Sequence, residues 1–477
     1  MTTPKHKILI KGEFSGIQNY IFNIQSEGAA KELRKRSLHI ADKNQAYADH
    51  LCKSLNLNCE HLAAGNFILI GDATSGLEEE FFKIRKEIYK AHAKAPFKIF
   101  LSHLFVKEKE LSENYHQAIS NLSQKTNAEK LHFGKNNAYN EIFEPYYHQP
   151  PEMSASNPED CIPVFENIKQ TVLIDEVKNK GTIDFDDLAR FAELRTGSSY
   201  LASLKLDLDN LGKKFFSLTD PESNKHLSQQ LHFFFEDPDG TLKQLIKNGS
   251  WQGMDGKKHY FSDNLYLVFA GGDDTFILGG YDALWEFTAT LYSKFNEFAQ
   301  NLKKDFPHLN LTFSASYNIF HSKFPVVKIA GKAEETLDEA KNYTYATEEL
   351  PQKNKISILG QVFTWKEFMR LGEISYQLTR LIQNGESKTL LNRIRLSYKG
   401  FQSAEKDFSQ GKLTMQKVWN LFYFIRNVKK QNADKVEQLM KEYENMILDD
   451  YLESKKSNPM LFPVAARLAE LYTRNTT

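Results

Sequence analysis

Cysteine is scarce in this sequence of 477 residues. The three that occur, Cys52, Cys59 and Cys161, include no CxxC pair. Neither a disulfide framework nor a zinc site with four cysteine ligands can be assembled from these thiols. The sequence therefore excludes structural zinc as a main support of the fold.

Long apolar runs are also missing, as is an excess of one sign of charge. No apolar run approaches the roughly 18 residues that span a bilayer, and residues 1–12 are too short and too charged for a signal peptide. We therefore expect a cytoplasmic protein without membrane contacts. Lys and Arg number 61, as do Asp and Glu, while 41% of the residues are hydrophobic and 13% aromatic. This composition is that of a globular protein, and the length predicts about three domains.

Short apolar segments alternate with amphipathic ones in residues 1–145. The order strand, helix, strand, helix, strand is typical of an α+β sandwich. Four prolines between positions 145 and 158 then break all periodicity, so we interpret residues 146–195 as a linker without a zinc site. The segments that carry the pattern are 7–11, 27–55, 61–70, 77–92 and 97–105.

The same alternation returns in residues 196–365, which we interpret as a second copy of the α+β fold. In residues 366–477 the apolar positions recur at helical spacing, which predicts a C-terminal helical bundle with a core of its own. This last region holds 19 Lys and Arg against 13 Asp and Glu. Such a surplus suits a surface that faces nucleic acid, and it also suits an ordinary solvated face. The second copy is expected to have strands at 201–206, 265–270, 275–278, 310–319 and 356–359, and helices at 210–218, 224–248, 283–304 and 326–345.

Three acidic residues stand next to predicted strand ends in the second copy. Asp207 ends one strand, while Asp273 and Asp274 follow another through Gly271 and Gly272, where a hairpin is expected. Carboxylates gathered at neighbouring strand ends suit Mg²⁺, and two such ions about 3.5–4 Å apart can activate an attacking hydroxyl and stabilise a leaving pyrophosphate. Glycines allow a nucleotide to approach the strand end closely. The alternative is a plain Gly–Asp turn, although adjacent acids after an apolar strand repel each other without a cation.

The stretches around these acids resemble a known family. ASLKLDLDNLGKKF, NLYLVFAGGDDTFILGGYDAL, and KAEETLDEAKN followed by KNKISILG are similar to the catalytic palm of the large subunit of type III CRISPR effector complexes. The opening GEFSGIQNYIFNI with GAAKELRKRS is similar to the first palm of that subunit in its Csm type. The resemblance covers residues 1–145 and 196–367. It implies two ferredoxin-like palms, related to nucleotidyl cyclases and GGDEF-type diguanylate cyclases, followed by a helical domain at 366–477.

The resemblance also implies an activity and its partners. Members of the family are nucleotidyltransferases that convert ATP into cyclic oligoadenylates, with pyrophosphate release, when their complex holds guide RNA paired with target RNA. The expected cofactors are two Mg²⁺ or Mn²⁺ ions, and the expected partners are both RNAs and the backbone, guide-end-capping and small helical subunits. Basic residues of the C-terminal helices are candidates to face the RNA. These are Arg393, Arg395, Lys399, Arg426, Lys429 and Lys430.

Site residues follow from the resemblance motif by motif. The family pattern calls for metal-binding carboxylates, glycines that shape the nucleotide approach, a lysine near the triphosphate and serines near the two bases. The lysine could instead be solvated on its helix, and the serines could be capping or turn residues. The matching positions are Asp207, Asp273 and Asp274; Gly271 and Gly272; Lys341 in DEAKN; Ser228 in LSQQLHFFF; and Ser15 in GEFSGIQ.

Departures from the family pattern limit the activities expected of this chain. None of the 14 histidines is followed by Asp, so we expect no HD nuclease domain and no DNA cleavage by this chain. The first palm has Ala64-Gly65-Asn66 in place of the acidic hairpin and is expected only to support a second nucleotide. Glu13 stands where the family often has Asp.

The sequence leaves other functions open. Adenylyl transfer to another acceptor, such as S-adenosylmethionine, would use the same metal and triphosphate contacts. A non-catalytic scaffold subunit is a further alternative. The presence of Asp207, Asp273 and Asp274 argues against it. A diguanylate cyclase normally works as a homodimer of single catalytic domains, which two fused palms do not require.

Overall fold

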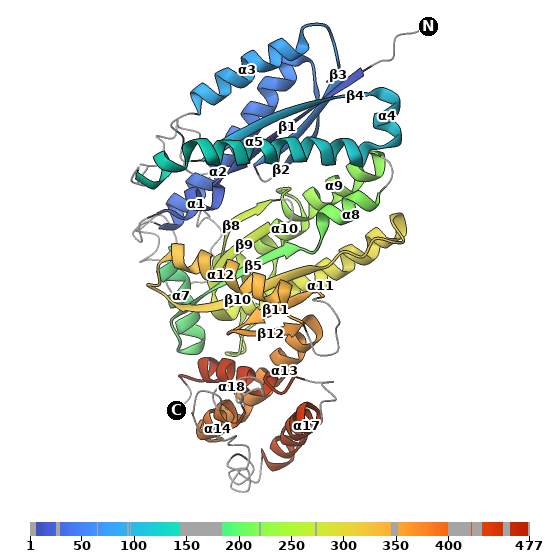
Figure 1. Ribbon diagram of the computed structural model, residues 1–477. Coiled ribbons are helices and arrows are strands. Elements are labelled where there is room, and N and C mark those ends of the chain that lie inside the picture. Colours follow the sequence, from blue (N-terminus) through green and yellow to red (C-terminus); the bar gives the residue numbers. More distant parts are fainter. Residues whose placement is uncertain are drawn as a thin grey trace.

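The computed structural model describes residues 6–24, 29–63, 65–92, 95, 97–143, 184–218, 221–271, 274–344, 352–398, 421, 432–451 and 458–475. Within these ranges, two large sheets covered by helices, and a small sheet of β6 (Ser250–Gln252) and β7 (Lys258–Tyr260), are followed by a group of helices (Figure 1). The predicted α+β class is confirmed. No helix among the described residues has both the length and the apolar character needed to cross a membrane.

The N-terminal unit, residues 6–143, is built on a four-stranded antiparallel sheet. The strands lie in the order β2-β3-β1-β4. This order, with a long helix (α2, preceded by the short α1) after the first strand and α3 after the third, is that of a ferredoxin-like fold. Its elements are β1 (His6–Ser15), α1 (Ile17–Phe22), α2 (Ala29–Leu55), β2 (Asn58–Ala63), β3 (Asn66–Asp72), α3 (Leu77–Ala91), β4 (Lys98–Lys107), α4 (Glu108–Glu113) and α5 (Tyr115–Phe143).

Helices cover both faces of this sheet, which explains why β1 is apolar at three successive positions. Ile8 and Ile10 are buried in a cluster with residues of α2 and α3, whereas Leu9 is buried on the opposite face against α5. The sequence pattern did not predict α5, because its apolar residues do not recur at helical spacing along its length.

The segment predicted as one strand at 61–70 is in fact a hairpin. β2 and β3 are antiparallel partners, and Gly65 between them has a φ of 80°. A Cβ at this position would lie 2.5 Å from the Cδ1 atom of Ile17. Glycine is therefore favoured here by the backbone angle, whereas the Ile17 methyl group is the end of a flexible side chain and could shift.

The central unit, residues 184–364, repeats the strand order of the N-terminal unit. Its sheet has the order β12-β11-β10-β5-β9-β8, in which only the β10–β11 pair is parallel, and β8-β9-β5-β10 corresponds to β2-β3-β1-β4. The predicted second copy is therefore present. The elements are α7 (Phe185–Thr196), β5 (Tyr200–Leu208), α8 (Leu211–Ser217), α9 (Pro221–Phe235), α10 (Thr241–Asn248), β6 (Ser250–Gln252), β7 (Lys258–Tyr260), a short 3-10 helix (Phe261–Asp263), β8 (Leu265–Gly271), β9 (Asp274–Gly280), α11 (Tyr281–Asp305), β10 (Phe313–His321), α12 (Val326–Asn342), β11 (Lys355–Ile358) and β12 (Gln361–Thr364).

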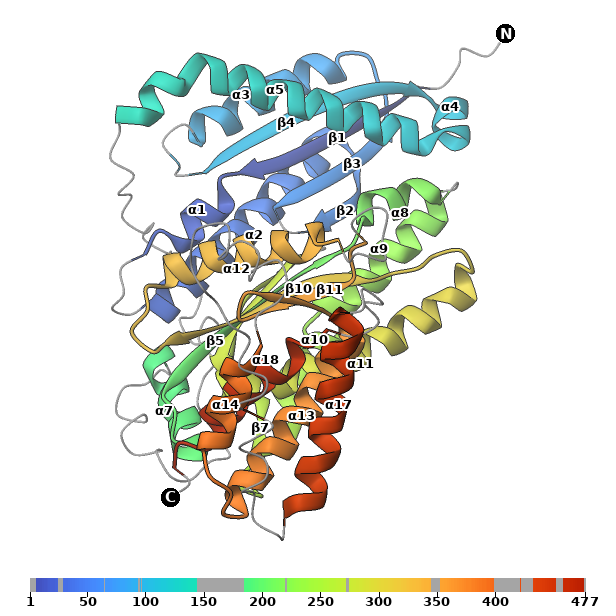
Figure 2. The same ribbon diagram turned by 60° about the horizontal axis from the view of Figure 1, so that its bottom comes forward.

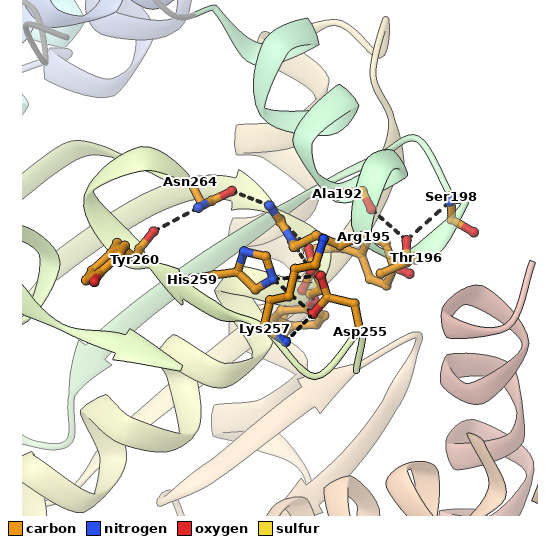
Figure 3. Close-up of polar contacts among 12 residues, drawn as sticks. Ala192, Arg195, Thr196, Ser198, Asp255, Lys257, His259, Tyr260 and Asn264 are labelled. Atoms are coloured by element: carbon orange, nitrogen blue, oxygen red, sulfur yellow. Dashed lines mark hydrogen bonds and ion pairs between the residues drawn. The ribbon is translucent and has the colours of Figure 1, made fainter. Parts of the chain in front are cut away.

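Helix α7 occupies part of the segment 146–195 that the sequence pattern assigned to a linker. Asp184 and Asp187 form a reciprocal capping box at its start. Near its end, Arg195 forms a two-pronged pair with Asp282 of α11, with Nε–Oδ2 and Nη2–Oδ1 distances of 2.6 and 2.8 Å. The third guanidinium nitrogen donates to Asn264 Oδ1 at 2.6 Å (Figure 3). This buried network fixes α7 to α11 and to the residue that precedes β8.

The two units share one buried core. A single cluster of apolar side chains joins residues of β1, α2 and α3 to residues of α7, β8, β9 and α12. Phe22 of α1 contacts Phe276 of β9 edge-to-face, with ring centroids 5.4 Å apart. Because apolar burial is the main stabilising term in folding, this interface holds the units in a fixed relation.

The C-terminal helices lie below the central unit in Figure 1, come to the front in Figure 2, and share the core of that unit. Trp365 stacks on Tyr292 with centroids 4.4 Å apart, and its Nε1 donates to the Phe313 carbonyl at 3.0 Å. The expectation of a separate helical core is wrong, because the apolar faces of these helices continue onto α11 and β10. The helices are α13 (Trp365–Gln383), α14 (Thr389–Ser397), α17 (Ala433–Tyr451) and α18 (Leu461–Tyr472).

Glu286 of α11 lies at this junction and makes folding dependent on pH. Burial, with a further contribution from the Asp282 carboxylate, raises the pKa of Glu286 to about 7. Above that pH the folded chain holds a buried charge, whereas below pH about 4.5 the carboxyl group is neutral in folded and unfolded chains alike. We therefore expect Glu286→Gln to raise the melting temperature at pH 8 and to leave it unchanged at pH 4. Equal shifts at both pH values in thermal unfolding would contradict this.

Candidate active site

Two of the predicted carboxylates meet at the end of the central sheet where the β8–β9 hairpin lies. This end of strands β5 and β9 is called the hairpin edge or strand edge below. Asp207 near the end of β5 and Asp274 at the start of β9 are direct partners in the antiparallel register. On its other side Asp274 faces Gly271, the last residue of β8. The β8–β9 hairpin is thus confirmed. Gly272 and Asp273, which lie between these strands in the sequence, fall outside the described residues.

A buried lysine that the sequence pattern did not single out neutralises part of this edge. Lys205 Nζ lies 3.2 Å from Asp274 Oδ2 and 2.5 Å from Glu334 Oε2 of α12. Burial by itself would lower the pKa of Lys205, but the two carboxylates outweigh it and the pKa is raised. A charged residue inside the otherwise apolar run of β5 was the signal that could have identified it.

Lys205 does not fully compensate the negative charge of the Asp274 carboxylate. Burial raises its pKa to about 6, even though Lys205 acts in the opposite direction. Its Oδ1 atom is buried, and no described residue donates a hydrogen bond to it. A buried carboxylate oxygen without a partner is costly, so the site favours an added cation.

Lys341, the lysine marked by the DEAKN motif, lies beside Asp207. Its Nζ is 2.9 Å from Asp207 Oδ2, and the two side chains are 17% and 23% exposed. Helix α12 therefore contributes Lys341 and Glu334 to the same strand edge, at its C-terminal end and two turns before it. The arrangement places a cation beside the carboxylates where phosphate charge would gather.

The second aspartate of KLDLDNLG has a different role. Asp209 is buried, and it accepts hydrogen bonds from Thr312 Oγ1, from Ser314 Oγ and from the Asn354 backbone, at 2.8, 2.8 and 2.9 Å. Its oxygens are therefore already used to hold β5, β10 and the start of β11 together. Asp207, rather than Asp209, is the carboxylate available to a ligand.

The two predicted serines lie apart from each other. Ser228 of α9 borders a cavity of about 520 Å³ between the two units, and His61 of β2 contacts it from the N-terminal unit. Ser15 ends β1 opposite Lys98 and shares no hydrogen bond or ion pair with another candidate among the described residues. Helix α1, which follows Ser15, lines a different cavity of about 610 Å³ together with Lys205 and Glu334.

Glu13 of β1 pairs with two lysines. Its carboxylate lies 3.1 Å from Lys11 Nζ and also contacts Lys130 of α5. Burial alone would raise the pKa of Glu13, but the two lysines lower it overall. The residue is thus an ion-pair partner that ties β1 to α5.

The carboxylates of Asp207 and Asp274 are suitable ligands for a divalent cation. Asp207 and Asp274 are in register, and Asp274 has an unused buried oxygen. Oxygen ligands of this kind are those that Mg²⁺ and Mn²⁺ take. Among the described residues no group of three His, Cys, Asp or Glu side chains comes close enough to hold a metal ion, and the predicted third ligand, Asp273, lies outside the described residues.

The repeated strand order, with carboxylates at the hairpin of the second copy, defines a protein with two palm domains of the nucleotidyl cyclase type. Residues 200–356 match the second palm domain of Cas10/Cmr2, and residues 6–146 match domain B of the Csm1 subunit. The chain belongs to the Cas10/Csm1 family, the large subunits of type III CRISPR effector complexes.

Relatives show how far the similarity extends. A Cas10/Csm1 protein of Methanocaldococcus jannaschii, named as a single-strand-specific deoxyribonuclease of CRISPR subtype III-A, is 32% identical over 227 residues, 46% of this chain and 27% of that protein. A protein of the same name from Streptococcus thermophilus is 24% identical over 492 residues, 82% of this chain and 61% of that protein. The similarity thus spans about a quarter of the Methanocaldococcus jannaschii protein and about three fifths of the Streptococcus thermophilus protein.

A solved structure supports the fold over nearly the whole chain. A Csm1–Csm4 cassette in complex with cA4 superposes with a TM-score of 0.63 at 19% identity. The superposition covers 98% of this chain and 70% of that chain. At this identity the likeness establishes the fold.

Proposed function

We propose that the chain is a nucleotidyltransferase that joins ATP molecules into cyclic oligoadenylates and releases pyrophosphate. The observation that carries this proposal is the pairing of Asp207 with Asp274 at the hairpin edge, where one buried carboxylate oxygen has no described partner. The family, and the relative solved with cA4, point to the same chemistry. The N-terminal palm completes the cleft and supports the second nucleotide.

Each residue of the edge has a distinct task in this proposal. Asp207, Asp274 and Asp273 would hold the divalent cations, which supply activation of the attacking hydroxyl and neutralise charge on the phosphates. Lys341 directs its positive charge toward the triphosphate, next to Asp207. Lys205 keeps Asp274 in place between β9 and α12. Together these groups pre-arrange the charges that phosphoryl transfer requires.

We propose that the reaction runs inside a type III complex and starts when guide RNA pairs with target RNA. The proposed partners are the backbone, guide-end-capping and small helical subunits. The relative structure is a cassette of Csm1 with Csm4, which supports assembly with at least one other subunit. In this arrangement the C-terminal helices are the surface that faces RNA.

Product analysis of the reconstituted complex tests the function. The complex is incubated with target RNA, Mg²⁺, labelled ATP and candidate acceptors including S-adenosylmethionine, and the products are read by mass spectrometry. Cyclic oligoadenylates that appear only with matching target RNA are the expected result. An adenylylated acceptor as the main product would show that the chain transfers AMP to that acceptor instead. If no nucleotide product forms with any acceptor, the chain would be a non-catalytic scaffold subunit.

Exposed Arg393 on α14 allows a test of the RNA-facing surface. If the Arg393 guanidinium neutralises one RNA phosphate, Arg393→Glu lowers the slope of log affinity against log salt by about one. RNA affinity of the complex is measured between about 50 and 200 mM salt, where this electrostatic effect is large. Lys86→Glu, at an exposed position of α3, serves as the control. A slope equal to that of the wild type would identify Arg393 as solvated. Lys399, Arg426, Lys429 and Lys430 lie outside the described residues.

A further inference from the structure

The cavity of about 520 Å³ between the two units has the size and lining of a site for a neutral ring. Its volume is within the usual range of small-molecule pockets. Leu211 and Phe215 form part of its wall, and they belong to α8, the first helix after the strand that carries Asp207. Its remaining apolar and amide lining includes Leu62, Gln45, Gln229 and Phe233.

The charges around this cavity exclude phosphate from it. Glu60, Glu236 and Asp237 line it, and the only described basic group among its lining residues other than His61 is His232, which pairs with Glu236 at 3.5 Å. Phosphates would be repelled here and attracted to Lys341 and Lys205 at the strand edge. A nucleotide with its phosphates at that edge would therefore place its base in this cavity.

One polar pair bridges the two units inside the cavity. His61 Nδ1 of β2 lies 3.3 Å from Ser228 Oγ of α9. Burial lowers the pKa of the His61 imidazole, an effect only partly offset by the Asn66 side chain. The ring is thus neutral near pH 7 and carries one donor and one acceptor nitrogen.

We propose that His61 is the positioning residue that gives this nucleotide site its preference for adenine over guanine, by fixing the direction of the Ser228 hydroxyl. This inference rests on the proposed function and adds a specificity determinant to it. In the proposed tautomer His61 carries its proton on Nε2, so Ser228 donates its own proton to Nδ1 and the serine oxygen is left as an acceptor for the cavity. An acceptor pairs with the 6-amino group of adenine and repels the 6-oxo group of guanine.

A serine without the histidine could not make this distinction. A free hydroxyl rotates to donate or accept as needed, so it would serve either base. The N-terminal unit, although it lacks the acidic hairpin, would then contribute directly to substrate choice in the second palm. The competing explanation is that the His61–Ser228 contact only joins the two units.

The test compares ATP with GTP as substrates of the complex with target RNA and Mg²⁺. For His61→Leu we expect the ratio of kcat/KM for ATP to that for GTP to fall about tenfold, mainly through KM for ATP, because one directed hydrogen bond is removed. His61→Asn, whose amide oxygen can accept at the position of Nδ1, should restore most of the ratio. In a Ser228→Ala background, His61→Leu should have no further effect, since the two residues act as a unit. His103→Asn, in β4 beside Glu78, is the matched control.

Three outcomes decide the proposal. A tenfold loss of selectivity in His61→Leu with rescue by Asn supports it, provided that melting temperatures stay near that of the wild type. An unchanged ATP-to-GTP ratio in an active His61→Leu complex would overturn it and leave a structural contact. If the wild-type complex forms no product, the proposed function fails, and equilibrium affinities of the full chain for ATP and GTP then decide the role of His61 by the same ratio.

Discussion

Replacing Asp273 and Asp274 together by alanine is expected to abolish product synthesis by the complex, a loss of at least about a thousandfold. The reason is that the double variant removes the partner of Asp207 across β5 and β9, together with the buried Asp274 Oδ1 atom, to which no described residue donates a hydrogen bond. Assembly should be intact, because the cores of the two units do not depend on these side chains. The measurement is product formation from labelled ATP, with subunit content checked on the same sample.

Asp72→Ala provides the matched control for this experiment. Asp72 pairs with Lys7 on the surface of the N-terminal unit, and its side chain is 71% exposed. Its loss should change neither assembly nor synthesis. Product formation at the wild-type rate by the Asp273→Ala/Asp274→Ala complex would place the chemistry elsewhere in the complex.

The largest expected effect on stability comes from Arg195. Its side chain and that of Asp282 are 4% and 5% exposed, and Arg195→Met would leave the aspartate buried without its charged partner. Breaking a buried pair on one side typically costs about 3–5 kcal/mol of unfolding free energy. Thermal or denaturant unfolding of the full chain measures this loss.

Two further variants separate charge burial from a general effect of substitution. Adding Asp282→Asn to Arg195→Met should recover part of the stability, because the unpaired charge is then removed. Arg370→Met breaks a more exposed pair with Glu442, whose side chains are 33% and 28% exposed, and should cost about 1 kcal/mol or less. Equal losses for Arg195→Met and Arg370→Met would show that burial of the α7 network is not what stabilises it.

Elements with clear periodicity could be predicted from the sequence. The β8–β9 hairpin and α2 stand close to their predicted positions, because apolar runs and amphipathic spacing report burial directly. Helix α7 is not predicted because the prolines of the preceding segment dominate the pattern, although the acids at 184 and 187 form a capping box. The hairpin of β2 and β3 resembles one strand in the sequence, since a single glycine at 65 makes its turn.

The candidate site was predictable only where a motif marks it. Asp207, Asp274 and Lys341 each belong to a motif, and the structure places Asp207 beside both of the others. Lys205, Glu334 and His61 were not identified, because their partners lie far away in the sequence, as in the contact between His61 and Ser228 across 167 positions. Contacts of this kind depend on how two folded units meet, and no local pattern encodes that arrangement.

Manganese binding tests the central claim, that the hairpin edge of the second palm holds a metal–nucleotide complex, most directly. Mn²⁺ is titrated into the full chain in the presence of a non-hydrolysable ATP analogue and followed by electron paramagnetic resonance. The wild type should bind Mn²⁺, and Asp207→Asn and Asp274→Asn should each weaken that binding at least about tenfold, since each removes a charged oxygen ligand. Equal Mn²⁺ affinity in the wild type and both variants would contradict the account.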